Sequence, residues 1–210
     1  MARRQGVLDE DPEVARSQIL AAADTAIQRF GIAKTTIDDV AKETGVSRPT
    51  IYRYFRDRDT LMASMIEIRS RRLFEQTREY LADRSTFAEQ VVDGLLYLVD
   101  RGRQDPAIRL IVTPEHAGRQ TALAGSSGLA SRLTYEMWAP LIAAARGRGE
   151  IREGISDVEI CNWITLVELI LVGRMDFGEP DGPGNKRLLT NLLLPGIVTT
   201  PRGGHAVAVP

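Results

Sequence analysis

The 210-residue chain has very few of the residues that carry metal and redox chemistry. It contains one cysteine, Cys161, and two histidines, His116 and His205. A single cysteine excludes an intramolecular disulfide and a cysteine-rich metal site, and it suits a reducing compartment such as the cytoplasm. The sequence also lacks a glycine-rich phosphate loop and a nucleophile with a neighbouring base. We therefore expect that the protein is not an enzyme, and that it has no catalytic residues, no metal and no cofactor.

Long apolar runs are missing as well. The most apolar segment, residues 163–172, contains Thr165 and Glu168, and it is about half of the roughly twenty residues that a membrane-spanning helix needs. No apolar stretch follows Arg3 and Arg4, so no signal peptide is expected. These absences favour a cytoplasmic globular protein without a membrane partner.

Excess charge of one sign is absent too, because the net charge is -1. The charge is nevertheless uneven along the chain. Arg48, Arg53, Arg56 and Arg58 stand within eleven residues that hold one acid, Asp57. The local field near a contact surface matters more than the sum, so this segment favours a phosphate-bearing partner.

Apolar residues recur at three- and four-residue spacing, and no alternating strand pattern is present. Capping signals precede several of these periodic segments, as in Thr36–Asp39, Thr86–Glu89 and Ser156–Glu159. The sequence predicts an all-α fold with a glycine-rich loop at 118–128. The expected helices span about 12–30, 37–44, 48–55, 58–82, 86–104, 105–114, 129–145 with a bend at Pro140, 157–175, and 185–194 before Pro195.

Two short helices flank Gly45-Val46-Ser47 within TTIDDVAKETGVSRPTIYRYFRDRDTL, residues 35–61. Glycine at this turn permits the steep exit of a helix-turn-helix. The expected inner residues are Ile37, Val40, Ala41, Val46, Ile51 and Phe55, packed against Ile27 and Phe30. The outward residues of the second helix are Arg48, Pro49, Thr50, Arg53 and Tyr54, with Tyr52 at the flank. A donor-rich helix of this kind suits insertion into a major groove.

This segment resembles the DNA-binding domain of the TetR family. The matching residues are Thr36, Asp39, Val40, Ala41, Gly45, Val46, Ser47, Ile51, Tyr52, Tyr54, Phe55, Arg58 and Leu61. Arg58 stands where the family usually has lysine, and Pro49 replaces a frequent glycine or alanine. The resemblance implies phosphate contacts by Thr36, Tyr52, Tyr54 and Arg58, and Arg48, Thr50 and Arg53 are the candidates for base edges.

Each of these residues also has a simpler interpretation. Surface arginines are often merely solvated, and Tyr52 could be a core residue with a hydrated hydroxyl. Arg3 and Arg4 could enter an adjacent minor groove, or they could belong to a disordered arm.

The two helices at 157–175 and 185–194 are apolar on nearly all sides, which predicts burial against a partner subunit. The alternative is a self-contained core helix. The resemblance implies a four-helix interface in a two-fold homodimer that binds a palindromic operator in double-stranded DNA.

The resemblance also implies a pocket for a small-molecule effector among the central helices. The candidates are Tyr97, Ile111, His116, Trp138, Leu141, Trp163 and Glu168. Aromatic and aliphatic walls with few polar groups suit a small, largely apolar ligand, although residues at helical spacing are also ordinary core. Cys161 has two interpretations, an oxidant sensor or inert packing.

The resulting hypothesis has an arm at 1–11, a three-helix DNA-binding domain at 12–60, a helical ligand-binding and dimerisation domain at 61–199, and a flexible tail at 200–210. We predict a sequence-specific transcriptional regulator, by default a repressor that its effector releases. The alternative is a helical ligand-binding adaptor of the same fold that does not bind DNA.

Overall fold

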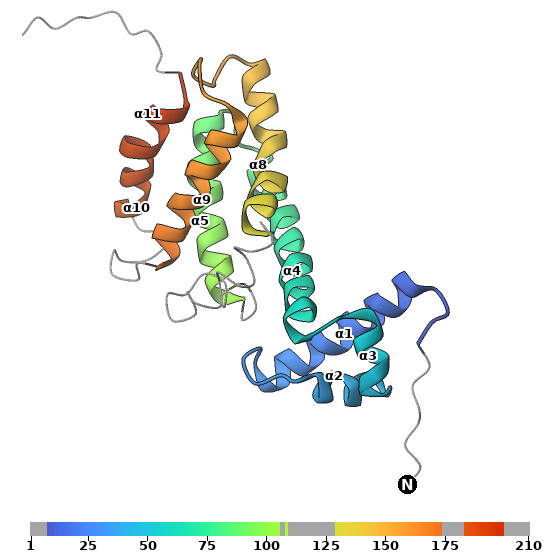
Figure 1. Cartoon of the computed structure of the whole chain (residues 1–210). Helices are drawn as coiled ribbons and strands as arrows, with labels where there is room; N and C mark the ends of the chain where they lie inside the picture. The colour runs from blue at the N-terminus through green and yellow to red at the C-terminus, as the bar shows by residue number, and fades with distance from the viewer. Residues whose placement is uncertain (1–7, 106–107, 109–128, 174–182, 200–210) are drawn as a thin grey trace, which may run out of the picture. The chain divides into compact units, whose positions relative to one another are not determined.

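The computed structural model describes residues 8–105, 108, 129–173 and 183–199 (Figure 1). The helices there are α1 (Pro12–Phe30), α2 (Ile37–Thr44), α3 (Arg48–Tyr54), α4 (Arg58–Leu81), α5 (Phe87–Gln104), α8 (Leu129–Gly147), α9 (Asp157–Gly173), α10 (Pro183–Leu188), the π-helical turn η4 (Leu189–Leu193) and α11 (Leu194–Ile197). Within these ranges, extended backbone pairs only in the bridge between Ile151 and Val198. The all-α prediction is confirmed. The loop at 118–128, the tail from 200, and most of the helix at 105–114 and of the arm lie outside the described residues.

The chain forms two compact units, and each is described here by itself. The first takes the residues up to Arg72 and those from Gly102 to Leu129, and the second takes Leu73–Arg101 and the residues from Ala130 onward. Helices α4 and α5 each contribute to both units. The first unit holds α1, α2 and α3, whereas the second holds α8, α9 and α10–α11.

Local side-chain caps begin the helices where the sequence predicts them. The Asp11 carboxylate accepts the Glu13 N–H at 2.8 Å. Reciprocal capping boxes close at three other predicted starts, namely Thr36–Asp39, Thr86–Glu89 and Ser156–Glu159. Because every partner lies within four residues, these contacts form as soon as the helix does. The predicted capping boxes are therefore confirmed.

The start of α4 is capped by Asp57, and this cap leads to a test by pH. Oδ1 of Asp57 accepts the N–H and the hydroxyl of Thr60, each at 2.7 Å. These hydrogen bonds, with those from Arg56, lower the pKa of Asp57 to about 2. Since the unfolded value is about 3.9, the cap stabilises the fold above roughly pH 4 and is lost as the pH falls through about 2.

We expect Asp57→Ala to lower the free energy of unfolding by about 1 kcal/mol at pH 7. The difference from the unmodified protein should shrink as the pH falls below 4, because Asp57 of the unfolded chain then takes up a proton while the folded carboxylate stays ionised down to about pH 2. Urea unfolding between pH 7 and pH 3 measures this, with Asp57→Asn as the control that keeps a capping oxygen. A difference that does not change with pH would contradict the assignment.

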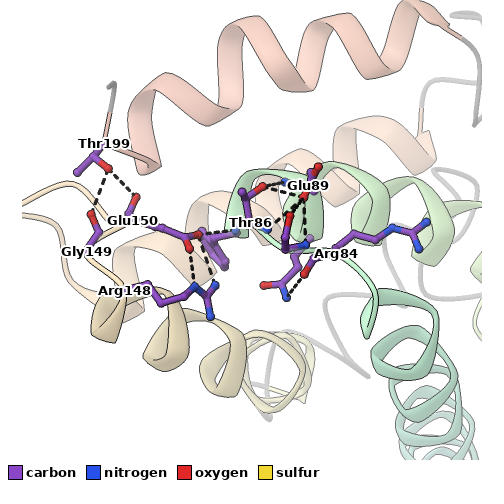
Figure 2. A network of polar contacts seen from close by, with 10 residues as sticks. Arg84, Thr86, Glu89, Arg148, Gly149, Glu150 and Thr199 are labelled. Atoms are coloured by element: carbon purple, nitrogen blue, oxygen red, sulfur yellow. Dashed lines mark hydrogen bonds and ion pairs between the residues drawn. The ribbon is translucent and has the colours of Figure 1, made fainter. Parts of the chain in front are cut away.

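In the second unit, a polar network ties the start of α5 to the turn after α8 and to the C-terminal segment (Figure 2). Oε2 of Glu150 accepts the N–H of Phe87 at 2.5 Å, so a residue far along the chain caps α5. Its hydrogen bond with Arg148 lowers the pKa of Glu150. The N–H of Thr199 donates to the Glu150 carbonyl at 2.9 Å, and its hydroxyl donates to the Gly149 carbonyl at 3.2 Å. The 149–152 turn therefore connects the end of α8 to the start of α5 and to the C-terminal segment at Thr199.

The last helix differs from the prediction, which ended it before Pro195. The helical path runs on to Ile197, with Pro195 in the first turn of α11. The preceding turn is π-helical, and the N–H of Leu194 reaches back to the carbonyl of Leu189. Proline lacks an N–H and its ring crowds the carbonyl four residues before it. The wider turn accommodates both effects.

Candidate nucleic-acid interface

The helix-turn-helix is fixed at both sides of its turn. Gly45 follows α2 in the left-handed conformation, with φ 77°, and its N–H bonds to the Ala41 carbonyl. An L side chain rarely adopts that conformation, so glycine is needed here. The Ser47 hydroxyl then accepts the Thr50 N–H and begins α3. The sequence thus determines both the exit of α2 and the start of α3.

A small apolar core holds α3 in place. Ile51 and Phe55 are fully buried and pack in one cluster with Ile27, Ile37 and Val40. The guanidinium of Arg16 lies 4.2 Å from the centroid of the Phe55 ring. It also donates to the Tyr54 carbonyl at 3.1 Å and to the Ser64 hydroxyl at 2.8 Å. Arg16 therefore joins α1, α3 and α4.

One expected core residue is not in the core. Phe30 is 44% exposed, and the Arg29 guanidinium lies 5.8 Å from its ring centroid. Gly31, with φ 76°, ends α1 at this point. The chain turns there, and Ile32 is buried in place of Phe30.

The outer face of α3 presents donors to solvent. The exposed residues are Arg48, Pro49, Tyr52 and Arg53, while Thr50 and Tyr54 are half-buried. Arg53 Nη2 lies 3.4 Å from the Tyr54 hydroxyl, and its guanidinium lies 5.3 Å from the centre of that ring. Tyr54 also packs against the apolar core. Six of the eight predicted DNA-contact residues therefore lie together along one short, rigid helix.

The other two have roles within the fold: the sequence predicts the cap at Thr36, but it does not predict the contacts of Arg58. The Thr36 hydroxyl donates to Asp39 at 2.6 Å and its N–H donates to the same carboxylate at 2.9 Å. Hydrogen bonds from Thr36 lower the pKa of Asp39. With Asp38 and Asp39 in the first turn of α2, the helix dipole is already met by negative charge. These contacts favour a capping role for Thr36 over phosphate binding.

Arg58 is held by backbone carbonyls of the loop between α1 and α2. Its Nε donates to the Thr35 carbonyl at 2.8 Å and its Nη2 donates to the Ile32 carbonyl at 2.5 Å. The guanidinium thereby attaches the start of α4 to that loop. This geometry favours a structural role over the predicted phosphate contact, because Nε and Nη2 of Arg58 both donate to carbonyls inside the unit.

We expect Arg58→Ala to lower the free energy of unfolding by about 2 kcal/mol, since two carbonyls lose a charged donor. Thermal unfolding measures this loss. Arg56→Ala is the matched control, because its side chain is 88% exposed and removes the same charge. Unchanged stability, with a salt slope of DNA binding lowered by about one, would instead identify Arg58 as a phosphate contact.

The structure separates the predicted effector residues. Trp138 on α8 is fully buried and Leu141 is half-buried, whereas Trp163 on α9 is 44% exposed. Tyr97 on α5 stacks on Tyr80, with ring centroids 4.5 Å apart. Ile111 and His116 lie outside the described residues.

Glu168 on α9 is the polar member of this set that the structure brings near Trp138. Burial of its carboxyl raises the pKa to about 7, and the nearby Trp138 N–H acts in the opposite direction. That indole N–H is itself buried and has no partner at hydrogen-bond distance among the described residues. An added Cβ on Gly94 would lie 2.9 Å from Trp138, so glycine is required where α5 meets the indole. Burial also raises the pKa of Cys161 to about 11, which favours inert packing over a reactive thiolate.

Part of α9 and α10–η4 is apolar but uncovered. One face of α9 is buried through Ile160, Cys161 and Ile164. The exposed apolar residues of the same elements are Val158, Trp163, Leu166, Ile170, Leu188 and Leu192. We call these six residues the exposed apolar face. The part of the chain that the structure describes contains no helix long and apolar enough to cross a membrane.

Comparisons with known proteins agree with this geometry. A family profile described as "Bacterial regulatory proteins, tetR family" matches residues 19–65. An uncharacterized HTH-type transcriptional regulator from Mycobacterium tuberculosis is 28% identical over 137 residues, which is 65% of this chain and 69% of that protein. A TetR-family transcriptional regulator from Pectobacterium atrosepticum superposes with a TM-score of 0.63 at 19% identity, covering 93% of this chain and 100% of that one. RolR, solved with its ligand resorcinol, superposes with a TM-score of 0.65 at 15% identity, covering 90% and 89%.

Proposed function

Because the chain belongs to the TetR family of bacterial regulatory proteins, we propose that it binds a palindromic operator as a homodimer and represses transcription until a small effector releases it. The protein is a DNA-binding transcriptional regulator. The observation that carries the proposal is the outer face of α3, where arginine, threonine and tyrosine side chains line one capped helix. The proposed site of action is the cytoplasm.

The roles along α3 follow from the reach and chemistry of each side chain. Arg48, Thr50 and Arg53 are proposed to read base edges, because arginine can contact O6 and N7 of guanine with two donors. Tyr52 and Tyr54 are proposed to contact phosphates, which fix register without reading sequence. Pro49 stiffens the first turn of α3 and offers an apolar surface to the groove.

The homodimer is proposed from the exposed apolar face. Trp163, Leu166 and Ile170 recur at helical spacing on α9, opposite residues that are already buried. Exposed apolar residues gathered on the same helices in this way are typical of an interaction surface. A two-fold pairing of α9 and α10–α11 would cover it with the same face of a second copy. Two copies of α3 would then read half-sites roughly 34–36 Å apart.

The effector site is proposed to lie around Trp138, Leu141 and Glu168 in the second unit. Trp138 offers a buried N–H, and Glu168 near its pKa of about 7 can either donate or accept a hydrogen bond at neutral pH. An apolar pocket with a few such groups suits a small, largely apolar molecule. The binding of resorcinol by RolR supports an effector of that size. The other predicted effector contacts, which stay predictions, are Tyr97, Ile111, His116 and Trp163.

Communication between effector and DNA is proposed to run through Arg69. Within the first unit its guanidinium binds Asp24 of α1, with Nε at 3.0 Å, and Asp105 directly after α5 at 2.9 Å. Arg69 is largely buried, and Asp105 in turn accepts the Ile108 N–H at 3.1 Å. A shift at the end of α5 would thus be transmitted to α1. The effector must bind the released state more tightly to change occupancy.

The domain division follows from these roles. We assign DNA binding to residues 12–60 and effector binding and dimerisation to 61–199, with an arm at 1–11 and a tail at 200–210. The first compact unit extends beyond this boundary, to Arg72.

Selection of bound duplexes from a random DNA pool by the full-length protein tests the proposal. An enriched palindromic site, with half-sites about one helical turn apart, is the expected result. Enrichment of no sequence would contradict the proposal and would favour the adaptor.

A further inference from the structure

An acidic residue of α2 contacts the first arginine of α3. Asp38 Oδ1 lies 3.2 Å from Arg48 Nε, and Arg48 Nη1 donates to Asp38 Oδ2 at 3.3 Å. Tyr52, one turn further along α3, also interacts with this guanidinium. The contact with Tyr52 and the charge of Asp38 raise the pKa of Arg48. Arg48 is thus held between two elements of the helix-turn-helix.

This ion pair is poorly placed to stabilise the fold. The side chains of Arg48 and Asp38 are 55% and 48% exposed, and exposed ion pairs contribute little to stability. A carboxylate at this surface also repels DNA phosphates. An effect on how Arg48 is presented to DNA accounts for its position better than an effect on folding.

We propose that Asp38 is a positioning residue that fixes Arg48 for reading a guanine, and that it thereby determines base preference. The inference rests on the proposed function of α3. A free arginine side chain samples many rotamers, so holding its planar fork in one geometry reduces the entropy lost on contacting a base. Asp38 faces two nitrogens of a group that carries five N–H donors, and donors remain for O6 and N7 of guanine.

Exclusion of water at the DNA surface strengthens the arrangement. When DNA covers this surface, the local dielectric constant falls and the attraction between Asp38 and Arg48 grows. A base without the two acceptors of guanine leaves the held guanidinium unsatisfied, which costs affinity. Discrimination against other bases therefore depends on Asp38 as well as on Arg48.

The opposite effect is also physically defined. If Asp38 competed with DNA for Arg48, its removal would increase the affinity for every sequence and leave the preferred base unchanged. The two effects differ in base preference, which a purely structural role does not alter.

The test compares duplex selection by the full-length protein with that by Asp38→Asn, Asp38→Ala and Arg48→Ala. Glu43→Gln is the matched control. It removes the same charge from the same helix, but Glu43 pairs with Arg29 instead of Arg48. We expect a preferred guanine at one position of each half-site. Both Asp38 variants and Arg48→Ala should lose about fivefold or more of this discrimination, while Glu43→Gln keeps it. Circular dichroism checks that each variant folds.

Two results would overturn the proposal. One is an Asp38 variant with the wild-type base preference, whatever its affinity. The other is an Arg48→Ala protein that still prefers the same guanine. Failure of the proposed function is distinguishable, because the unmodified protein would then enrich no site at all.

Discussion

Replacing Leu192 with glutamate is expected to give a monomer that binds the selected operator about 10²–10⁴-fold more weakly than the dimer. Leu192 is the most exposed member of the exposed apolar face, at 71%. A charge there would be buried against the same face of the second copy, where it has no partner and is strongly unfavourable. Each α3 would then bind its half-site alone, without the affinity that is gained when two copies of α3 are linked in one dimer.

Light scattering after size exclusion measures the mass, and fluorescence anisotropy measures binding to the operator and to a single half-site. Tyr135→Glu is the control, since Tyr135 is 46% exposed on α8 and lies outside the exposed apolar face. We expect Leu192→Glu to keep its affinity for the half-site. A variant that stays dimeric, or a monomer with full operator affinity, would show that the dimer is formed elsewhere.

Truncating Phe55 is expected to have the largest effect on the stability of the apolar core formed by α1, α2 and α3. Its ring is fully buried at the end of α3, beneath the Arg16 guanidinium. Phe55→Ala should lower the free energy of unfolding by about 3–5 kcal/mol, through lost burial and the cavity that remains. DNA binding should fall with it, because α3 loses the contact that fixes its C-terminal end.

Thermal unfolding followed by circular dichroism, together with anisotropy on the operator, measures both effects. Phe55→Leu is the comparison, as it keeps most of the apolar volume and should lose much less stability. If Phe55→Ala unfolded at the wild-type temperature, the core assigned to α1, α2 and α3 would be incorrect.

The features that the sequence predicted well are those with local causes. The capping boxes at Thr36, Thr86 and Ser156 and the turn at Gly45 each depend on residues within four positions. The apolar spacing of α2 and α3 likewise identified Val40, Ile51 and Phe55 as core. The fold class and the position of the helix that we propose binds DNA follow from such patterns.

The features that the sequence missed depend on distant partners or on where the chain turns. Arg58 bonds to carbonyls 23 and 26 residues earlier, which no local pattern encodes. Phe30 continues the apolar repeat of α1. The helix ends there, however, with Gly31 as its cap, and the Phe30 side chain stays partly exposed. Asp38 lies within the predicted start of α2, and its contact with Arg48 arises only when α2 and α3 pack. An acid three residues before Ala41 and ten before Arg48 was the available signal.

The effector site is the least predictable part for a related reason. Aromatic residues on amphipathic helices look alike whether they face a pocket, a core or a partner. Trp138 and Trp163 both lie in helices rich in apolar residues, yet one is fully buried and the other belongs to the exposed apolar face. The tertiary contacts of α5 and α8, including the close approach of Gly94 to Trp138, distinguish them.

The central claim is that α3 reads a DNA sequence. Fluorescence anisotropy of the full-length protein on the selected duplex and on a scrambled duplex, over several salt concentrations, tests it most directly. We expect binding to the selected duplex to be at least about 10³-fold tighter, and the affinity to fall steeply with salt as phosphates are neutralised. Weak and equal binding to both duplexes would contradict the claim and leave a helical ligand-binding adaptor as the better description.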